Sequence, residues 1–233
     1  MGIALRRVIT VDGLAASGKS SIAKQLAQRL GYVYFSSGIL YRGVGALALR
    51  AGTDLNDGEA LGRLVASHEW QLRNDSKGNN VLFLDGIPFG PELFTPEGSE
   101  AASRVAVFPE VRDALLEPQR QAFSPASIVG EGRDLGTVLF PQADLKLFVQ
   151  VPEEVRVERR LAQWASNHGQ VPSDMEAAIR REIAERDRRD AERSLAPTVA
   201  APDAVIIDNS TAALTEIVQK LYHLALQRGL VAE

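Results

Sequence analysis

The stretch Gly13-Leu14-Ala15-Ala16-Ser17-Gly18-Lys19-Ser20 decides the fold of this chain, because it matches the phosphate-binding pattern G-x-x-x-x-G-K-[ST]. A β-branched run at residues 8–11 precedes it, and a helical pattern over residues 19–30 follows it. In this setting, backbone N–H groups surround the oxygens of a triphosphate. Lys19 would reach the β- and γ-phosphates, and the hydroxyl of Ser20 would ligate Mg²⁺. The alternative is a glycine-rich turn that holds no ligand.

Outward from this loop, the chain alternates strands and helices. Further apolar runs at residues 32–35, 126–129, 145–149 and 204–207 predict strands, and helical patterns lie between and after them. A helix to about residue 50 would begin after Ser36 or Ser37, either of which can cap it. This order predicts an α/β fold, a P-loop NTPase core with a mostly parallel sheet flanked by helices, as one domain over residues 1–233.

Two segments interrupt the alternation. Runs at residues 70–73 and 81–84 around a polar turn predict a hairpin, so we interpret residues 64–98 as a small insertion on the core. Residues 155–193 predict two helices joined by a loop at residues 166–173, and they carry nine of the 21 arginines. We interpret this second segment as a helical lid.

Composition excludes several other classes. The 233 residues contain no cysteine, which removes disulfides and thiolate chemistry and fits a cytoplasmic location. No apolar run is long enough to cross a bilayer, and no signal peptide is evident at the start. A formal net charge of -4 argues against general nucleic-acid binding. The expectation is a globular enzyme with neither a membrane nor a nucleic-acid partner, acting as a monomer.

The arginines and carboxylates downstream suggest where a second anion would bind. The chain has 21 Arg among its 26 basic residues, and Arg matches phosphate oxygens as a planar fork of donors. An apolar strand ends in Glu131, Arg133 and Asp134, at the sheet edge where ligands of α/β folds collect. Beside a triphosphate site, Glu131 becomes a candidate for arranging Mg²⁺ through water, and Arg133 for binding phosphate.

One charged helix face supports the lid hypothesis. Arg186, Asp190 and Arg193 fall at i, i+4 and i+7, so they share a face that carries no apolar residue. The simpler explanation is a solvated helix with ion pairs of about 0.3–0.5 kcal/mol each. Next to a triphosphate, an arginine-bearing flap that closes over the transferred phosphoryl group is the better explanation.

These residues together resemble the bacterial cytidylate kinase family, within the nucleoside monophosphate kinases. The resemblance runs from about residue 7 to residue 208. Besides the phosphate-binding loop, it rests on Ser37-Gly38-Ile39-Leu40-Tyr41-Arg42, Phe108-Pro109-Glu110-Val111-Arg112 and Gly132-Arg133-Asp134-Leu135-Gly136-Thr137-Val138. Ala102-Ser103 and the run Glu185-Arg186-Asp187 followed by Asp190 and Arg193 complete it. Ser36 and Glu131 depart from the family, in which Asp is usual at both positions.

The resemblance implies transfer of the γ-phosphoryl group of ATP to CMP or dCMP, with Mg²⁺ as the metal. Lys19, Arg133 and Arg193 would be catalytic. The ATP-binding residues would be Gly13, Leu14, Ala15, Ala16, Ser17, Gly18, Lys19, Ser20, Ser21 and Arg159. The CMP-binding residues would be Ser37, Arg42, Ser103, Arg112, Arg133, Asp134, Arg186, Asp190 and Arg193. Among the latter, Arg42, Arg133 and Arg193 would hold the acceptor phosphate, Ser103, Arg112 and Asp134 the cytosine, and Arg186 and Asp190 the ribose.

Two other functions stay open from the sequence. One is a P-loop kinase for another small acceptor, such as UMP, AMP or shikimate. The other is a nucleotide-dependent switch or binding protein, against which the chain lacks the guanine-reading motif Asn-Lys-x-Asp. A panel of acceptors separates the first alternative, and slow ATP hydrolysis that no acceptor stimulates would indicate the second.

Overall fold

Five parallel strands form the central sheet, in the order β2-β6-β1-β7-β8. The computed structural model of the chain describes residues 6–192 and 196–231, without the side chains of residues 167, 168 and 192. The strands are β1 (Val8–Gly13), β2 (Val33–Ser36), β6 (Ile128–Gly132), β7 (Leu145–Gln150) and β8 (Val205–Asp208). Strand β1 is central, pairing Val8 with Ile128 on one side and Ile9 with Leu145 on the other. The predicted parallel α/β sheet is confirmed, with shifts of one to three residues at strand ends.

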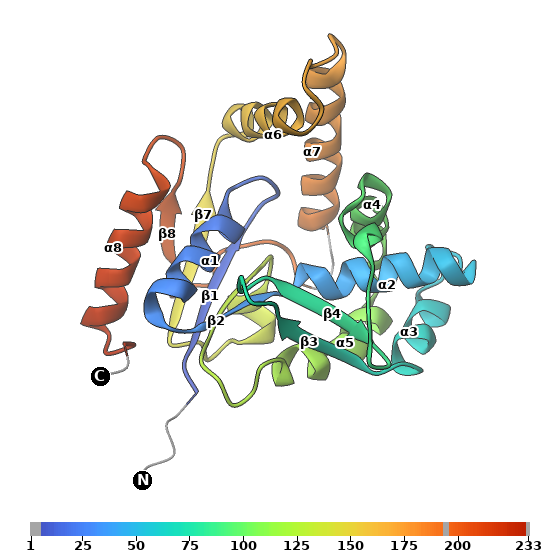
Figure 1. The fold of residues 1–233 in the computed structure, drawn as a ribbon, viewed down its shortest axis with the longest axis horizontal. Coiled ribbons are helices and arrows are strands. Elements are labelled where there is room, and N and C mark those ends of the chain that lie inside the picture. The colour runs from blue at the N-terminus through green and yellow to red at the C-terminus, as the bar shows by residue number, and fades with distance from the viewer. Residues whose placement is uncertain (1–5, 193–195, 232–233) are drawn as a thin grey trace.

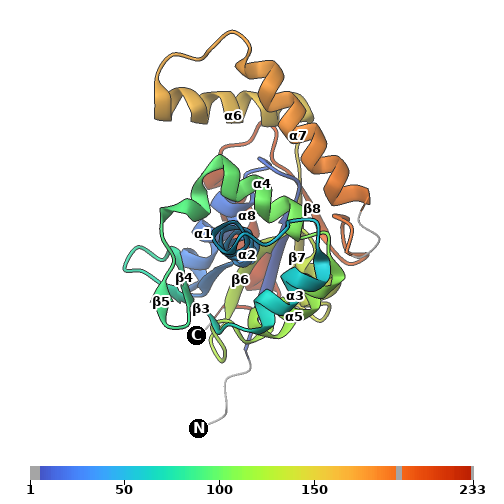
Figure 2. The same ribbon diagram turned by 90° about the vertical axis from the view of Figure 1, so that its right-hand side faces the viewer.

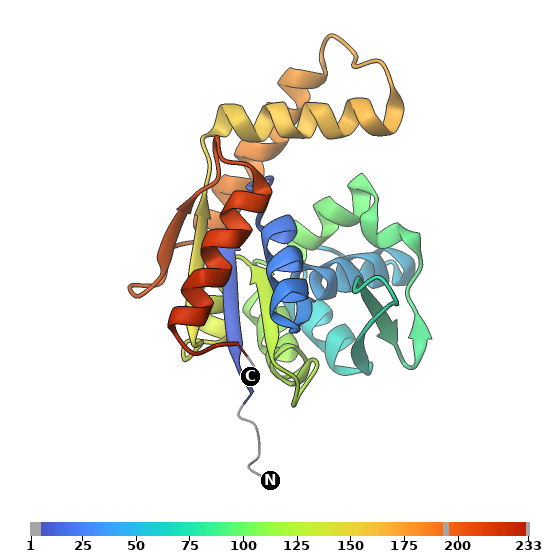
Figure 3. The ribbon, with the colours of Figure 1, turned by 60° about the vertical axis from the view of Figure 1, so that its left-hand side comes forward.

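Helices α1 (Lys19–Leu30) and α8 (Leu214–Gln227) cover one face of this sheet (Figures 1 and 3). The residues predicted to repeat along α1, namely Ile22, Leu26 and Leu30, are buried against β1 and β7. The opposite face meets a π-helical turn, η2 (Leu135–Leu139), where a Cβ on Gly136 would lie 2.9 Å from the hydroxyl of Thr10. This packing fixes the end of β1, from which the phosphate-binding loop begins.

A second layer of helices surrounds the predicted hairpin. The hairpin, β3 (Trp70–Asn74) and β4 (Asn80–Leu84), continues into the short β5 (Ile87–Pro88) and the 3-10 helix η1 (Pro91–Phe94). Around it lie α2 (Gly38–Ala51), α3 (Gly58–Ala66), α4 (Pro96–Val105) and α5 (Pro109–Gln121). These elements share their own core, which includes Leu40, Leu61, Leu82 and Leu115. Residues 64 and 98 fall inside α3 and α4, so the insertion range stays a prediction about function and does not follow element boundaries.

The charged segment forms two helices that extend above the rest of the molecule (Figure 2). Helices α6 (Glu153–His168) and α7 (Met175–Glu192) pack through a small core of Val157, Ile179 and Ile183. Their connection spans residues 169–174, so the first three residues of the predicted loop, 166–168, belong to α6. Among the described helices, none is both long and apolar enough to cross a bilayer.

Candidate active site

The phosphate-binding loop connects β1 to α1 as the sequence predicts. Its curvature requires left-handed backbone at Ala16 (φ 56°) and Gly18 (φ 84°). Lys19 is buried, and its ammonium donates to the carbonyl of Leu14 at 3.2 Å. Burial, together with the positive charge of Arg133, lowers the pKa of Lys19 to about 7. An anion bound in this loop would stabilise the charged form of Lys19 and offset the free energy that its burial costs.

Polar side chains from distant elements hold the outer side of the loop. Asn209, directly after β8, donates to the carbonyl of Ser17 at 2.7 Å. From α6, Arg156 reaches the carbonyl of Ala15 at 3.3 Å and Arg159 that of Ser17 at 3.4 Å. These hydrogen bonds engage the carbonyls of Ala15 and Ser17 and so help to hold the backbone of the loop in place. Asn209 is not among the residues predicted from the sequence, although a polar residue at the end of a predicted strand is a usable signal.

A pocket of about 1130 Å³ opens beside the loop, at the carboxyl ends of β2 and β6. From the predicted triphosphate set it is lined by Ala15, Ala16, Gly18, Lys19, Ser20, Ser21 and Arg159. From the predicted acceptor set it is lined by Ser37, Arg42, Ser103, Arg112, Arg133, Asp134, Arg186 and Asp190. Gly13, Leu14 and Ser17 lie outside this lining, and Arg193 is outside the described residues. Apart from these four, the two predicted sets therefore share one cavity.

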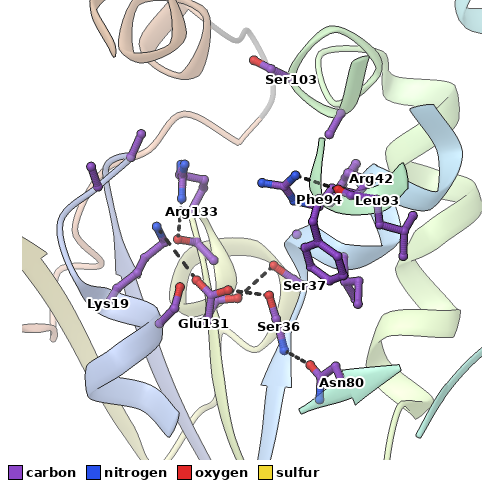
Figure 4. Close-up of a pocket in the computed structure, with 18 of the residues that line it drawn as sticks. Lys19, Ser36, Ser37, Arg42, Asn80, Leu93, Phe94, Ser103, Glu131 and Arg133 are labelled. Atoms are coloured by element: carbon purple, nitrogen blue, oxygen red, sulfur yellow. Dashed lines mark hydrogen bonds and ion pairs between the residues drawn. The ribbon is translucent and has the colours of Figure 1, made fainter. Parts of the chain in front are cut away.

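Glu131 faces Lys19 at the floor of the pocket (Figure 4). Both residues are only 6% exposed, and the carboxylate Oε2 lies 3.9 Å from the lysine Nζ. The hydroxyl of Ser36 donates to the other carboxylate oxygen, Oε1. Ser37, one of the two serines expected to cap α2, stands at its N-cap position, but its hydroxyl donates to the backbone carbonyl of Glu131 at 3.1 Å and forms no capping bond. The start of α2 is thereby attached to β6.

Two of the predicted phosphate-binding arginines come from opposite walls. Arg42 of α2 is anchored by the carbonyl of Leu93 at 2.8 Å and the hydroxyl of Ser99 at 2.6 Å (Figure 4). Arg133 follows β6 and pairs with Asp190 of α7 at 2.8 Å. Burial and the charge of Arg133 lower the pKa of Arg186 to about 10. This concentration of cations fits an anionic ligand that neutralises them.

Three groups suited to a polar base lie further along the pocket. Arg112 of α5 forms an ion pair with Asp134, and both side chains are almost buried. The hydroxyl of Ser103 on α4 is buried with no partner among the described residues. A carboxylate, a guanidinium and a free hydroxyl can together read a ring that presents both donors and acceptors. The unsatisfied Ser103 marks a place where a ligand would complete the hydrogen bonding.

The pocket also offers oxygen donors for a metal ion. Ser20 and Glu131 both line it, from α1 and β6. No cluster of three or more His, Cys, Asp or Glu that could hold a metal occurs within the described ranges. Two oxygen donors fit Mg²⁺, which keeps most of its waters and takes other ligands from phosphates.

Asp12 is a further buried carboxyl that the sequence analysis did not identify. Its two oxygens accept from the backbone N–H groups of Leu135 and Gly136, at 2.9 and 2.8 Å. Burial raises the pKa of Asp12 to about 7, although these hydrogen bonds oppose the shift. Asp12 thus fixes the turn that follows Arg133 and Asp134.

Comparison with known proteins places this geometry in context. Residues 9–227 match the family model described as cytidylate kinase. A cytidylate kinase of Solibacter usitatus is 37% identical over 223 residues, which cover 96% of this chain and 94% of the relative. A cytidylate kinase of Exiguobacterium sp. is 41% identical over 217 residues, covering 93% and 95%. Among solved structures, a shikimate kinase from Acinetobacter baumannii in complex with shikimate aligns with a TM-score of 0.44 and 16% identity, covering 97% of this chain and 96% of that chain. The family match spans the loop, the hairpin and the helices α6 and α7.

Proposed function

The chain belongs to the cytidylate kinase family, and from that premise we propose that it transfers the γ-phosphoryl group of ATP to CMP or dCMP, giving ADP and CDP or dCDP. The observation that carries the proposal is the single pocket lined both by the phosphate-binding loop and by the Arg112–Asp134 pair with Ser103. A site for a triphosphate and a site for a polar base in one cavity suit transfer between two nucleotides.

The donor half of the pocket would hold ATP. Backbone N–H groups of the loop and the N-terminus of α1 would surround the phosphates, and Lys19 would bridge the β- and γ-oxygens. Arg159, at the lid side of the pocket, would contact the ATP. Mg²⁺, held by Ser20 and through water by Glu131, would supply neutralising charge between the phosphates.

The acceptor half would hold CMP. Arg42, Arg133 and Arg193 would bind its phosphate, and Arg186 and Asp190 its ribose. Cytosine presents an N4 amine donor beside the O2 and N3 acceptors, so Asp134 would accept from the amine. Arg112 and Ser103 would donate to the acceptors, and Ser37 would border the ring. Uracil carries an oxygen in place of the amine and would meet Asp134 unfavourably.

This arrangement needs no general base. The acceptor phosphate has a second pKa of about 6, so it is a dianion near neutral pH and can attack directly. The chain's contribution is to align two anions and to neutralise them with Lys19 and arginines. Closure of α6 and α7 would exclude water, which would otherwise accept the phosphoryl group.

A coupled assay of ADP release tests the proposal directly. We expect rapid turnover with CMP and dCMP, and much slower turnover with UMP, AMP or shikimate. The matched control is Lys19→Met, which should lower turnover by orders of magnitude and so exclude a contaminating kinase. Faster turnover with another acceptor, or ATP hydrolysis that no acceptor stimulates, would reject the proposal. A monomeric state and a cytoplasmic location stay predictions.

A further inference from the structure

The hairpin reaches back to the core through Asn80, the first residue of β4. Strand β2 is an edge strand, paired with β6 on one side only. On its open edge, the Asn80 side chain accepts from the N–H of Ser36 at 2.5 Å and donates to the carbonyl of Tyr34 at 2.8 Å. A neighbouring parallel strand would make the same two bonds, so this amide substitutes for a strand at the sheet edge.

The geometry of the amide is itself fixed. Its nitrogen also donates to the side chain of Asn74 at 2.7 Å, across the hairpin. At the tip, Asn79 accepts from Lys24 of α1. The hairpin thus hydrogen-bonds to α1 through Asn79 and to β2 through Asn80, and the bond from Asn80 meets β2 at Ser36, which lines the pocket.

From Ser36 a short chain of side chains continues to the phosphate-binding lysine (Figure 4). The hydroxyl of Ser36 donates to Glu131, and the other oxygen of Glu131 faces Lys19 at 3.9 Å. Buried charges depend on the placement of their partners, because little water is present to compensate for a displaced one. The orientation of Ser36 thus bears directly on Lys19.

We propose that Asn80 is a positioning residue of the reaction: by joining the hairpin to the free edge of β2, it fixes Ser36 and Glu131 in the orientation that places Lys19. This inference rests on the proposed function. Asn80 acts through other residues and forms no bond with Ser103, Arg112 or Asp134 among its hydrogen bonds. Its removal should therefore change kcat and leave the KM for CMP within about twofold.

The first test compares two hairpin variants by steady-state kinetics. Asn80→Ala should lower kcat about tenfold, because a displacement near 1 Å at the reacting groups costs up to about a hundredfold. The control is Arg73→Ala, since Arg73 is exposed on β3 and stacks only within the hairpin, 4.4 Å from the ring of Phe83. Arg73→Ala should retain kcat. Equal losses in the two variants, or a loss confined to KM, would overturn the proposal.

A double-mutant cycle with Ser36→Ala tests whether Asn80 affects kcat through Ser36. Ser36→Ala removes the bond to Glu131 but keeps the backbone N–H that Asn80 binds. Measured alone, Ser36→Ala should also lower kcat, and an unchanged kcat in this variant would overturn the proposal even if Asn80→Ala does not fold. If Asn80 acts through Ser36, adding Asn80→Ala to Ser36→Ala should change kcat by less than about twofold. Multiplicative losses would show independent action and would contradict the proposal.

Amide hydrogen exchange at Ser36 separates this inference from the function itself. The N–H of Ser36 should exchange slowly in the wild type and at least tenfold faster in Asn80→Ala. Unchanged exchange would overturn the proposal whatever the kinetics show. A wild type inactive with CMP would instead reject the proposed function, and the exchange result would still decide whether Asn80 joins the hairpin to the sheet.

Discussion

At the scale of single residues, the ion pair between Arg112 and Asp134 defines the expected base preference. Asp134→Asn should lower kcat/KM for CMP roughly 10- to 150-fold, because a hydrogen bond to a charged group contributes about 1.5–3 kcal/mol. UMP should lose much less, since an amide can donate to the uracil oxygen that a carboxylate repels.

The measurement is kcat/KM for both acceptors, and the matched control is Asp113→Asn, an exposed neighbour on α5. Parallel losses for CMP and UMP would show that Asp134 does not read the base.

The raised pKa of Asp12 predicts how the stability of the folded protein changes with pH. Burial raises its pKa from 3.8 to about 7, so the folded protein binds this proton more tightly than the unfolded chain does. The stabilisation that comes from this tighter proton binding is fully present below about pH 4 and is lost as pH rises through 7. Relative to Asp12→Asn, the free energy of unfolding of the wild type should fall by about 1.4 kcal/mol for each pH unit within that window. Urea unfolding at several pH values measures it, and a constant difference would refute the pKa shift.

Where the motif is local, the sequence predicts the structure of the loop closely, with a strand before it and a helix after it. The loop from Gly13 to Ser20 is contiguous, so its chemistry follows from eight adjacent residues. Asp12, Asn80 and Asn209 were not identified, because their partners are 123, 44 and 192 residues away in the chain. The Arg112–Asp134 pair came only from the family resemblance, since neither residue alone indicates the other.

At the scale of elements, the start of α1 depends on Gly18. Its φ is 84°, and a Cβ there would lie 2.5 Å from the side-chain nitrogen of Asn209. Gly18→Ala should therefore displace the loop and weaken ATP binding at least tenfold.

Gly31→Ala is the control at the other end of α1. Gly31 has a φ of 69°, and a Cβ there would meet nothing within 4 Å. It should cost about 1–2 kcal/mol of backbone strain and leave ATP affinity unchanged. Titration calorimetry with ATP and thermal melting distinguish the variants. ATP affinity near wild type in Gly18→Ala would show that the loop tolerates the displacement.

Elements with local periodicity were predicted closely, and those that depend on tertiary packing were not. Helix α1 begins and ends at the predicted residues, and the hairpin strands agree within about one residue. The insertion at residues 64–98 stays a prediction, because α2 to α5 bury apolar faces largely against one another and their grouping depends on tertiary packing. Ser36 or Ser37 was expected to cap α2, but the hydroxyl of Ser37 donates to a backbone carbonyl of β6 and not to the helix.

At the scale of the whole molecule, three bodies enclose the pocket: the carboxyl edge of the sheet, the helices around the hairpin, and α6 with α7. An ion pair between Arg189 of α7 and Glu100 of α4, at 2.8 Å, connects two of them across the opening. A second ion pair, between Arg133 and Asp190 at 2.8 Å, connects the third body, the edge of the sheet, to α7. Each body contributes residues that alone would bind an anion weakly, so phosphoryl transfer requires that both nucleotides occupy the pocket together.

A crystal structure with CMP and a non-hydrolysable ATP analogue tests most directly whether both nucleotides occupy the pocket together. We expect the triphosphate in the loop beside Lys19, the phosphate of CMP between Arg42 and Arg133, and the cytosine against Asp134. CMP bound elsewhere on the protein, or an acceptor pocket that stays empty while these arginines point away from the triphosphate, would contradict this mechanism.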